Sequence, residues 1–172
     1  KLYTASKIPP KNFKWPAKPN YTFEESYPAE HIRTYTEKTL KNLGQEQIDL
    51  MQFHTWDDGW ASQEEWQRTV EELKKEGKIG AIGISMNRWE PENGIIALET
   101  GLIDAVQVIY NIFDQAPEDQ LFPFCEANDI AVIARVPFDE GTLTGSITRE
   151  TTFPEGDWRG TYFVPQNLIA SA

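Results

Sequence analysis

Two nitrogen-bearing side chains stand where strand-like patterns end. Lys7 closes an apolar, β-prone run that begins at Leu2, and His54 closes another that begins at Ile48. A desolvated lysine is a nucleophile that can form a Schiff base with a carbonyl compound, and histidine is a donor and acceptor near neutral pH. Taken in isolation, such a lysine is more often a solvated surface residue and such a histidine a structural one. His31, on a predicted helix, belongs to that structural class.

The residues that follow His54 include candidate metal ligands. Asp57 and Asp58 follow it closely and offer carboxylate oxygens. Asp-Asp-Gly is ordinary turn chemistry, however, and supplies no ligand geometry. Cys125 is the only cysteine among 172 residues, which excludes an internal disulfide and a cysteine-rich metal site. We therefore expect no metal.

The composition indicates a globular domain that avoids polyanions. Hydrophobic residues make up 40% of the chain, enough for one domain with a core. Sixteen basic and 27 acidic residues give a net charge of -11, so we expect neither nucleic acid nor an anionic membrane as a partner. No apolar run approaches the roughly 20 residues that span a bilayer, and no signal-like segment is present. With its single cysteine, the chain is typical of a soluble cytoplasmic protein.

Strand-like and helix-like segments alternate along the chain. The strand-like segments cover residues 2–7, 48–54, 79–85, 104–110 and 130–134. Helical patterns lie between them, over residues 29–43, 62–76, 91–100 and 117–128. The second of these begins with a Ser-Gln-Glu-Glu pattern of the capping-box form. Residues 11–28 are predicted to form a long ordered loop, and residues from 138 onward are loop-like.

This alternation predicts an α/β fold with a parallel sheet and right-handed crossovers. No Gly-x-Gly-x-x-Gly turn follows a strand, which disfavours a dinucleotide-binding open sheet, and units of roughly 25 to 30 residues suit a (β/α)8 TIM barrel. Such a barrel takes about 250 residues, so the barrel is expected to be incomplete, with about five βα units. A polypeptide of residues 1–172 alone would then expose unpaired sheet edges and self-associate.

Five segments resemble consecutive strands of the aldo-keto reductase superfamily. Residues 48–54, IDLMQFH, resemble the strand that ends in the active-site histidine, and residues 77–85, GKIGAIGIS, the next strand with its cofactor-contacting serine. Residues 107–111, QVIYN, are similar to the following strand, and residues 130–145 to the segment after it. Residues 3–7, YTASK, resemble the strand that ends in the catalytic lysine. The resemblance implies a single domain over residues 1–172, the central to late part of the barrel.

The resemblance also implies an activity, the NADPH-dependent reduction of an aldehyde or ketone to an alcohol. In the family, a tyrosine protonates the carbonyl oxygen, and a lysine paired with an aspartate lowers the pKa of that tyrosine. Lys7 matches this lysine, and His54 matches the histidine that orients the substrate carbonyl. The tyrosine and the aspartate belong to an earlier family segment that this sequence does not contain. We therefore expect residues 1–172 alone to be inactive.

Four residues are implied cofactor contacts: Ser85, Asn87, Gln107 and Arg135. Ser85 matches a serine that contacts the cofactor, and Gln107 matches a glutamine that contacts the nicotinamide carboxamide. Each can instead satisfy backbone groups near its strand end. Met86 stands where many members have asparagine, which leaves Asn87 one position later for that contact. Arg135 stands where a tyrosine often stacks on the nicotinamide, so a guanidinium plane takes that place. NADPH is implied by the resemblance alone, and NADH stays open.

Other functions remain open beside the reductase that acts on a small-molecule carbonyl substrate. One is a nucleotide-binding regulatory or interaction subunit with little turnover, as potassium-channel beta subunits of this superfamily are. Another is a barrel enzyme with a Schiff base at Lys7, which borohydride would trap. Trp56, Trp60 and Trp89 follow strand ends and either line an apolar pocket or pack under loops. The sequence does not identify the substrate, the physiological direction or the oligomeric state.

One geometric expectation joins these assignments. Lys7 and His54 should lie at the carboxyl ends of adjacent parallel strands and point into one mouth of the barrel. Ser85, Gln107 and Arg135 should continue around the same rim in chain order, because consecutive barrel strands are spatial neighbours.

Overall fold

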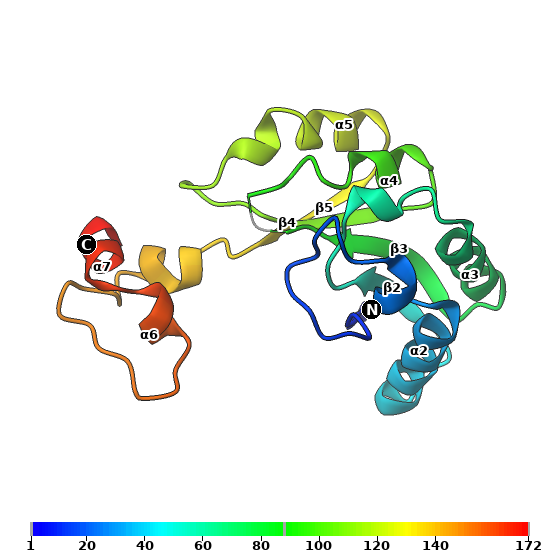
Figure 1. Ribbon diagram of the computed structural model, residues 1–172, viewed down its shortest axis with the longest axis horizontal. Helices are drawn as coiled ribbons and strands as arrows, with labels where there is room; N and C mark the ends of the chain where they lie inside the picture. The colour runs from blue at the N-terminus through cyan, green and yellow to red at the C-terminus, as the bar shows by residue number, and fades with distance from the viewer. Residues whose placement is uncertain (1, 88, 172) are drawn as a thin grey trace.

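The computed structural model describes residues 2–87 and 89–171. Residues 1, 88 and 172 lie outside the described residues, and two of them are the ends of the expected domain. Five strands form one sheet in the order β1-β2-β3-β4-β5, every neighbouring pair parallel (Figure 1). The strands are β1 Ala5–Ile8, β2 Ile48–Phe53, β3 Ile79–Ser85, β4 Ala105–Ile109 and β5 Ala131–Arg135. The predicted strand order and parallel pairing are confirmed.

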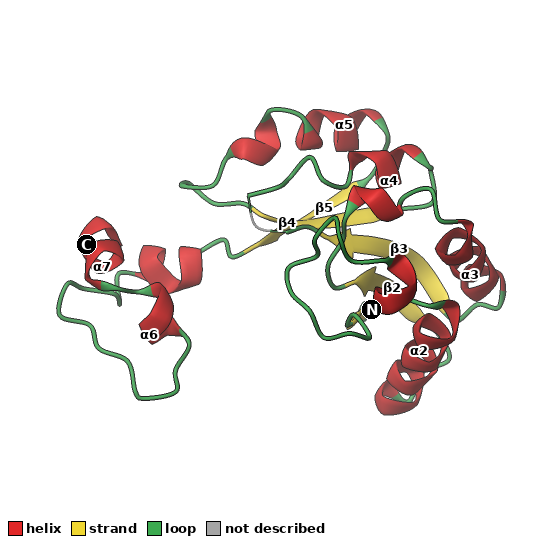
Figure 2. Cartoon of the chain, viewed as in Figure 1, coloured by secondary structure: helices red, strands yellow, loops and turns green. Residues whose placement is uncertain are grey.

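Helices connect the strands and follow the outer side of the sheet (Figure 2). The α-helices are α1 Phe23–Ser26, α2 Ala29–Leu43, α3 Glu64–Lys75, α4 Ile95–Glu99, α5 Leu121–Ala127, α6 Arg159–Tyr162 and α7 Pro165–Ser171. Three short 3-10 helices are η1 Asp58–Trp60, η2 Ala116–Glu118 and η3 Asp139–Thr144. No helix within residues 2–87 and 89–171 has the length and apolarity that a membrane crossing requires.

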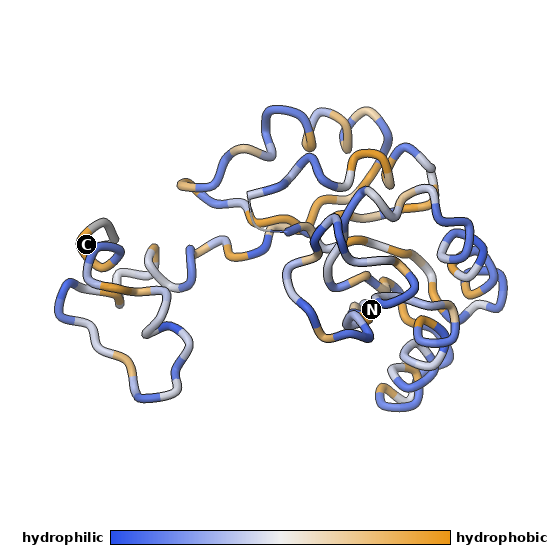
Figure 3. The backbone as a smooth tube through the Cα atoms, in the orientation of Figure 1, coloured by the Kyte–Doolittle hydropathy of each residue, from blue (hydrophilic) through white to orange (hydrophobic). Residues whose placement is uncertain are grey.

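The apolar face of the sheet forms the core with these helices. Side chains alternate between the two faces of a strand, and the outer set is almost fully buried: Met51, Phe53, Ile82, Ile84, Val106 and Val108. The ring of Phe53 lies 4.9 Å from that of Tyr27 and 5.4 Å from that of Trp56. Apolar colour follows the strands, whereas most of the tube of α2 and α3 has hydrophilic colour (Figure 3).

The opposite face, which we call the inner face, is lined by the other set of side chains. Lys7 pairs in register with Gln52, and Ser85 pairs with Gln107. Arg135 lies further along, paired with Ile109. By the same alternation these residues point to the side away from the helices. The inner face is therefore rich in polar side chains near the carboxyl ends of the strands.

Two helix starts differ from expectation, the first because of a contact with a distant segment and the second because of a local capping box. The capping box predicted at residues 62–65 is wrong: α3 begins after Gln63 without a side-chain cap. The Glu65 carboxylate instead accepts a hydrogen bond from the Ala29 backbone N–H, at 2.9 Å. A capping box does form within the expected loop of residues 11–28, where Thr22 and Glu25 cap α1 reciprocally.

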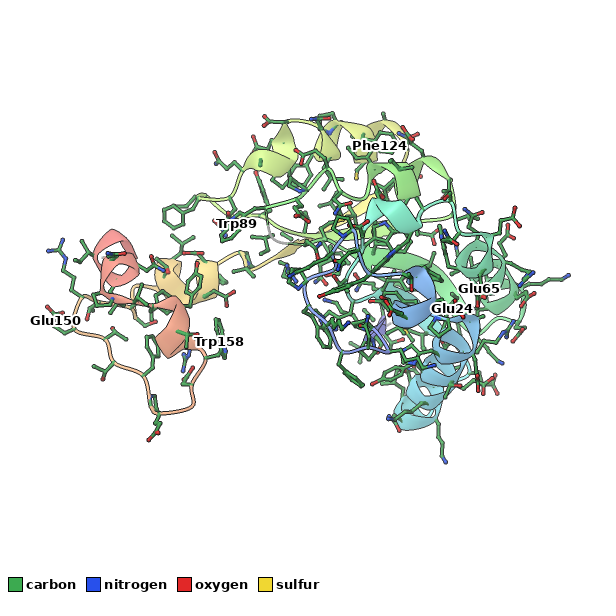
Figure 4. The ribbon with its side chains drawn as sticks, viewed as in Figure 1. Glu24, Glu65, Trp89, Phe124, Glu150 and Trp158 are labelled. Carbon is green, nitrogen blue, oxygen red and sulfur yellow. The ribbon has the colours of Figure 1, made fainter. Side chains whose placement is uncertain are left out.

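The C-terminal segment also differs, because residues 139–171 contain η3, α6 and α7 where a loop-like stretch is expected. In Figure 1 this segment lies apart from the sheet, joined to β5 by a short extended stretch. Its own aromatic side chains hold it together, with Phe153 and Phe163 stacked at 5.4 Å. Trp158 projects from it in Figure 4.

Candidate active site

The carboxyl ends of the strands bring the predicted basic residues to one place. Lys7 lies in β1, and His54 directly follows the adjacent strand β2, where its backbone N–H donates to the Ile8 carbonyl at 3.0 Å. Ser85 ends β3 and Arg135 ends β5. Gln107 lies in the middle of β4 rather than at its end, yet its register places it beside Ser85. The residues thus follow one another in chain order around one rim.

The cationic groups of this rim influence one another. Burial lowers the pKa of Lys7, and the charge of Arg135 lowers it further. Burial also lowers the pKa of His54, and the charges of Lys7 and Arg135 add to that effect. Each direction follows from the same physics, because desolvation and like charges both disfavour the protonated form. The rim is therefore a positively charged site in a chain of net charge -11.

A cavity of about 290 Å³ opens beside His54. Its lining residues are Trp15, Pro16, His54, Thr55, Met86, Asn87, Trp89 and Arg135. Trp15 presents its ring edge-on to the imidazole of His54, with 5.5 Å between ring centroids. Lys7, Ser85 and Gln107 are not among the lining residues. No tyrosine in the part of the chain that the structure describes lines this cavity.

The three predicted tryptophans divide between core and cavity. Trp56 and Trp60 are buried in the aromatic core beneath the loops, and neither lines the cavity at His54. Trp89 is 75% exposed and lines both the cavity at His54 and a second cavity of about 260 Å³. Figure 4 shows Trp89 on the side of the sheet from which the C-terminal segment departs. An aromatic wall is therefore supplied by Trp89 and Trp15.

Three buried oxygen atoms on the inner face have no hydrogen-bond partner among the described residues: Gln52 Oε1, Ser85 Oγ and Gln107 Oε1. An unsatisfied buried polar group costs about 1–3 kcal/mol, so such atoms mark places where a polar ligand group fits. Ser85 and Gln107 are neighbours in register. Sequence reasoning missed Gln52. Its signal was its position two residues before His54, which places both on the same strand face.

Asn87 reaches the cavity wall, but its amide is fully engaged by the protein. Its Oδ1 accepts from the Ala17 backbone N–H at 3.2 Å and from the Thr55 hydroxyl at 2.9 Å. Its Nδ2 donates to the Ala17 carbonyl at 3.1 Å and to the Glu90 carboxylate at 3.0 Å. An asparagine amide has two N–H donors and an oxygen with two lone pairs. In this arrangement Asn87 has no hydrogen-bonding capacity left for a carboxamide.

The aspartates after His54 hold loops together. Asp57 accepts from the Gly59 N–H at the start of η1. The Asp58 carboxylate accepts from the backbone N–H groups of Ile96 and Ala97 and so caps α4 from another segment. This explains why α4 begins at Ile95 rather than near residue 91. Within the described ranges, no three His, Cys, Asp or Glu side chains are grouped as metal ligands would be.

The basic, partly apolar mouth of this parallel sheet lies at the carboxyl ends of its strands, which is where (β/α)8 barrels place their ligand sites. The family model for the aldo/keto reductase family matches residues 2–165. The chain belongs to this family, and its five strands are a part of the (β/α)8 barrel.

Relatives and solved structures agree with this assignment. The chain is 36% identical over 128 residues to an NADH-specific methylglyoxal reductase of Escherichia coli, covering 70% of this chain and 37% of the relative. It is 30% identical over 133 residues to an NADP(+) aldo-keto reductase of Schizosaccharomyces pombe, covering 76% of this chain and 38% of that protein. The glycerol dehydrogenase structure from Gluconobacter oxydans has a TM-score of 0.70 and 32% identity, over 84% of this chain and 44% of its own. The chain thus spans less than half the length of each.

Proposed function

We propose that this chain carries the carbonyl-reducing half of an NADPH-dependent aldo-keto reductase active site, in which a small aldehyde or ketone becomes an alcohol. The observation that carries the proposal is the single rim shared by Lys7, His54 and the unsatisfied pair Ser85 and Gln107. Family membership supports an oxidoreductase, and the rim supplies groups suited to both cofactor and carbonyl oxygen.

The cofactor site is proposed from the unsatisfied atoms. Ser85 and Gln107 would hold the nicotinamide carboxamide, because their buried oxygens are side by side and have no partner within the described ranges. Arg135 would lie against the ring in place of an aromatic side chain. Asn87 is left out of this set. When bound, the reduced nicotinamide supplies the hydride. We propose NADPH, with NADH possible, since the relatives include an NADH-specific and an NADP(+) protein.

The protein side chains have distinct proposed roles in the reduction. His54, whose pKa is lowered, is neutral near pH 7 and can donate an imidazole N–H to the substrate carbonyl oxygen. Lys7 provides positive charge that stabilises a deprotonated acid beside it. The proton donor and its aspartate partner are proposed to come from outside these 172 residues, because no tyrosine of the described part lines the cavity. Residues 1–172 alone are therefore proposed to be inactive.

The substrate class follows from the cavity and its position. Trp15 and Trp89 offer apolar surface next to the basic rim, which suits a small carbonyl compound with a short carbon skeleton. The enzyme is proposed to act in the cytoplasm, where its free thiol Cys125 stays reduced.

The test uses the intact protein with NADPH and methylglyoxal, following the consumption of the reduced cofactor. Turnover is expected, and the variants Ser85→Ala and Gln107→Leu should each weaken NADPH binding by about tenfold, as expected for one lost hydrogen bond to a buried group. The surface variants Ser62→Ala and Gln45→Leu serve as matched controls and should bind normally. NADPH binding without turnover on any of a panel of aldehydes and ketones would support a regulatory nucleotide-binding subunit instead.

A further inference from the structure

The loop after β1 is fastened to the loops after β2 and β3 by a buried group of polar contacts. Thr55 follows β2, Asn87 follows β3, and Ala17 lies in the loop over residues 11–22. The Ala17 N–H donates to both Thr55 Oγ1, at 2.9 Å, and Asn87 Oδ1, at 3.2 Å. The Ala17 carbonyl accepts from Asn87 Nδ2 at 3.1 Å. We call Thr55, Asn87 and Ala17 the loop clamp.

The loop clamp is in turn held in place by hydrogen bonds to Tyr27. The Tyr27 hydroxyl donates to the Thr55 carbonyl and accepts from the Thr55 N–H, both at 3.1 Å. All three clamp residues are buried: Ala17 is 4% exposed, Thr55 3% and Asn87 7%. Buried hydrogen bonds of this kind fix geometry, because breaking one leaves a desolvated polar atom unpaired. The backbone at Ala17 is therefore tied to two other strand ends.

Trp15 lies two residues before Ala17 and occupies the cavity wall at His54. Its ring meets the imidazole edge-on with centroids 5.5 Å apart. It is 48% exposed, so its own burial is only partial. The position of Trp15 over His54 thus depends on the clamp at Ala17 as well as on contacts of its own ring.

We propose that Asn87 and Thr55 are positioning residues that hold Trp15 over His54 and so build the substrate-side wall of the cavity. The inference rests on the proposed function only for the identity of the substrate. The hydrogen bonds of the loop clamp and the position of Trp15 do not depend on that function. It also gives a reason for an asparagine at position 87: the amide donates to the carbonyl and accepts from the N–H of the same residue, Ala17, which a leucine side chain cannot do.

The kinetic test compares substitutions in the intact protein. Asn87→Leu and the near-isosteric Thr55→Val should raise the KM for methylglyoxal by about tenfold while kcat changes by less than about threefold, because the wall that binds substrate is displaced. Thr55→Ser, which keeps the hydroxyl, should restore the KM. Asn93→Leu is the matched control: this asparagine lies on the same loop but bonds to Asp58 and Glu90, not to Ala17. An unchanged KM in both clamp variants would overturn the proposal.

A second readout does not depend on turnover. Burial lowers the pKa of His54, and Lys7 from β1 and Arg135 from β5 are the charged groups that lower it further. Release of the Trp15 loop exposes the imidazole, so NMR titration of Asn87→Leu and Thr55→Val should show a higher pKa for His54. Trypsin should also cleave more rapidly after Lys14 in both variants. An unaltered His54 titration together with unaltered cleavage would refute the clamp even if the protein has no reductase activity. Altered titration without activity would instead refute only the proposed function.

Discussion

At the residue scale, the site is defined by three basic side chains, Lys7, His54 and Arg135, at the carboxyl ends of three strands. Burial lowers the pKa of both Lys7 and His54; the charge of Arg135 lowers both further, and the charge of Lys7 adds to the effect on His54. A mouth of this kind stabilises negative charge that develops on a carbonyl oxygen. It also disfavours a positively charged ligand ring. In the proposed function, the same electrostatics would stabilise the substrate carbonyl oxygen and would favour binding of the reduced over the oxidised cofactor.

The redox preference is testable at Arg135. Replacing the guanidinium in Arg135→Tyr removes one positive charge from the rim, so binding of the oxidised, positively charged nicotinamide should improve relative to the reduced form. We expect the ratio of the two dissociation constants to shift by about tenfold, or about 1.4 kcal/mol, for one partly screened charge. Calorimetric titration of both redox forms measures this ratio. The exposed Arg68→Tyr is the control, and an equal ratio in Arg135→Tyr and the parent protein would contradict the expectation.

At the element scale, strands were more readily predicted than helix ends. Apolar runs such as residues 79–85 identify buried strands because their periodicity is local. The start of α4 could not be predicted from the sequence, because backbone N–H groups in its first turn are capped by Asp58, which is far away in the chain. The pattern at Ser62 was misleading for the same reason: Glu65 is engaged by Ala29 of another helix.

The residues of the candidate site could be predicted only in part from the sequence. The others depend, like the starts of α3 and α4, on contacts between segments that are distant in the chain. Lys7 and His54 could be assigned because each closes a strand pattern and lies in a family-like motif. The hydrogen bonds of Asn87 could not be predicted from the sequence, because its partners Ala17 and Thr55 come close to it only in the folded sheet. Gln52 shares a strand face with His54, two residues away, but only the fold shows that its Oε1 is buried without a partner among the described residues.

The role of Asp58 gives a prediction about stability. Asp58→Ala removes the carboxylate that caps α4, and the expected loss is about 1–2 kcal/mol in the free energy of unfolding, typical of a lost helix cap. Urea denaturation of the intact protein measures this loss. The same loss should occur with and without EDTA, because the carboxylate acts as a cap. A chelator-dependent loss would instead indicate a bound metal ion.

At the scale of the whole molecule, the sheet has two unpaired edges. Within residues 2–87 and 89–171, strand β1 is paired only with β2, and strand β5 only with β4. Val132 on β5 is 39% exposed where a fully covered barrel strand would bury it. The chain also spans less than half the length of the relatives that it matches. The edges are thus the surfaces where the remainder of a closed barrel would pair.

A polypeptide made of residues 1–172 alone should therefore self-associate through its sheet edges. Sedimentation velocity over a range of concentrations should show oligomers or aggregates. Changing the β5 edge with Val132→Lys should reduce this association, because charged side chains discourage pairing at an edge. A stable monomer at high concentration would contradict the prediction.

The central claim is that Lys7 serves carbonyl reduction at this rim, and its removal in the intact protein is the most direct measurement. The rate of NADPH consumption with methylglyoxal is compared among the parent, Lys7→Met and the surface control Lys41→Met. In the proposed mechanism Lys7 supplies the charge that keeps the proton donor acidic, so Lys7→Met should lower kcat/KM by about 100-fold or more, while Lys41→Met should match the parent. Undiminished reduction in a folded, NADPH-binding Lys7→Met protein would contradict the account.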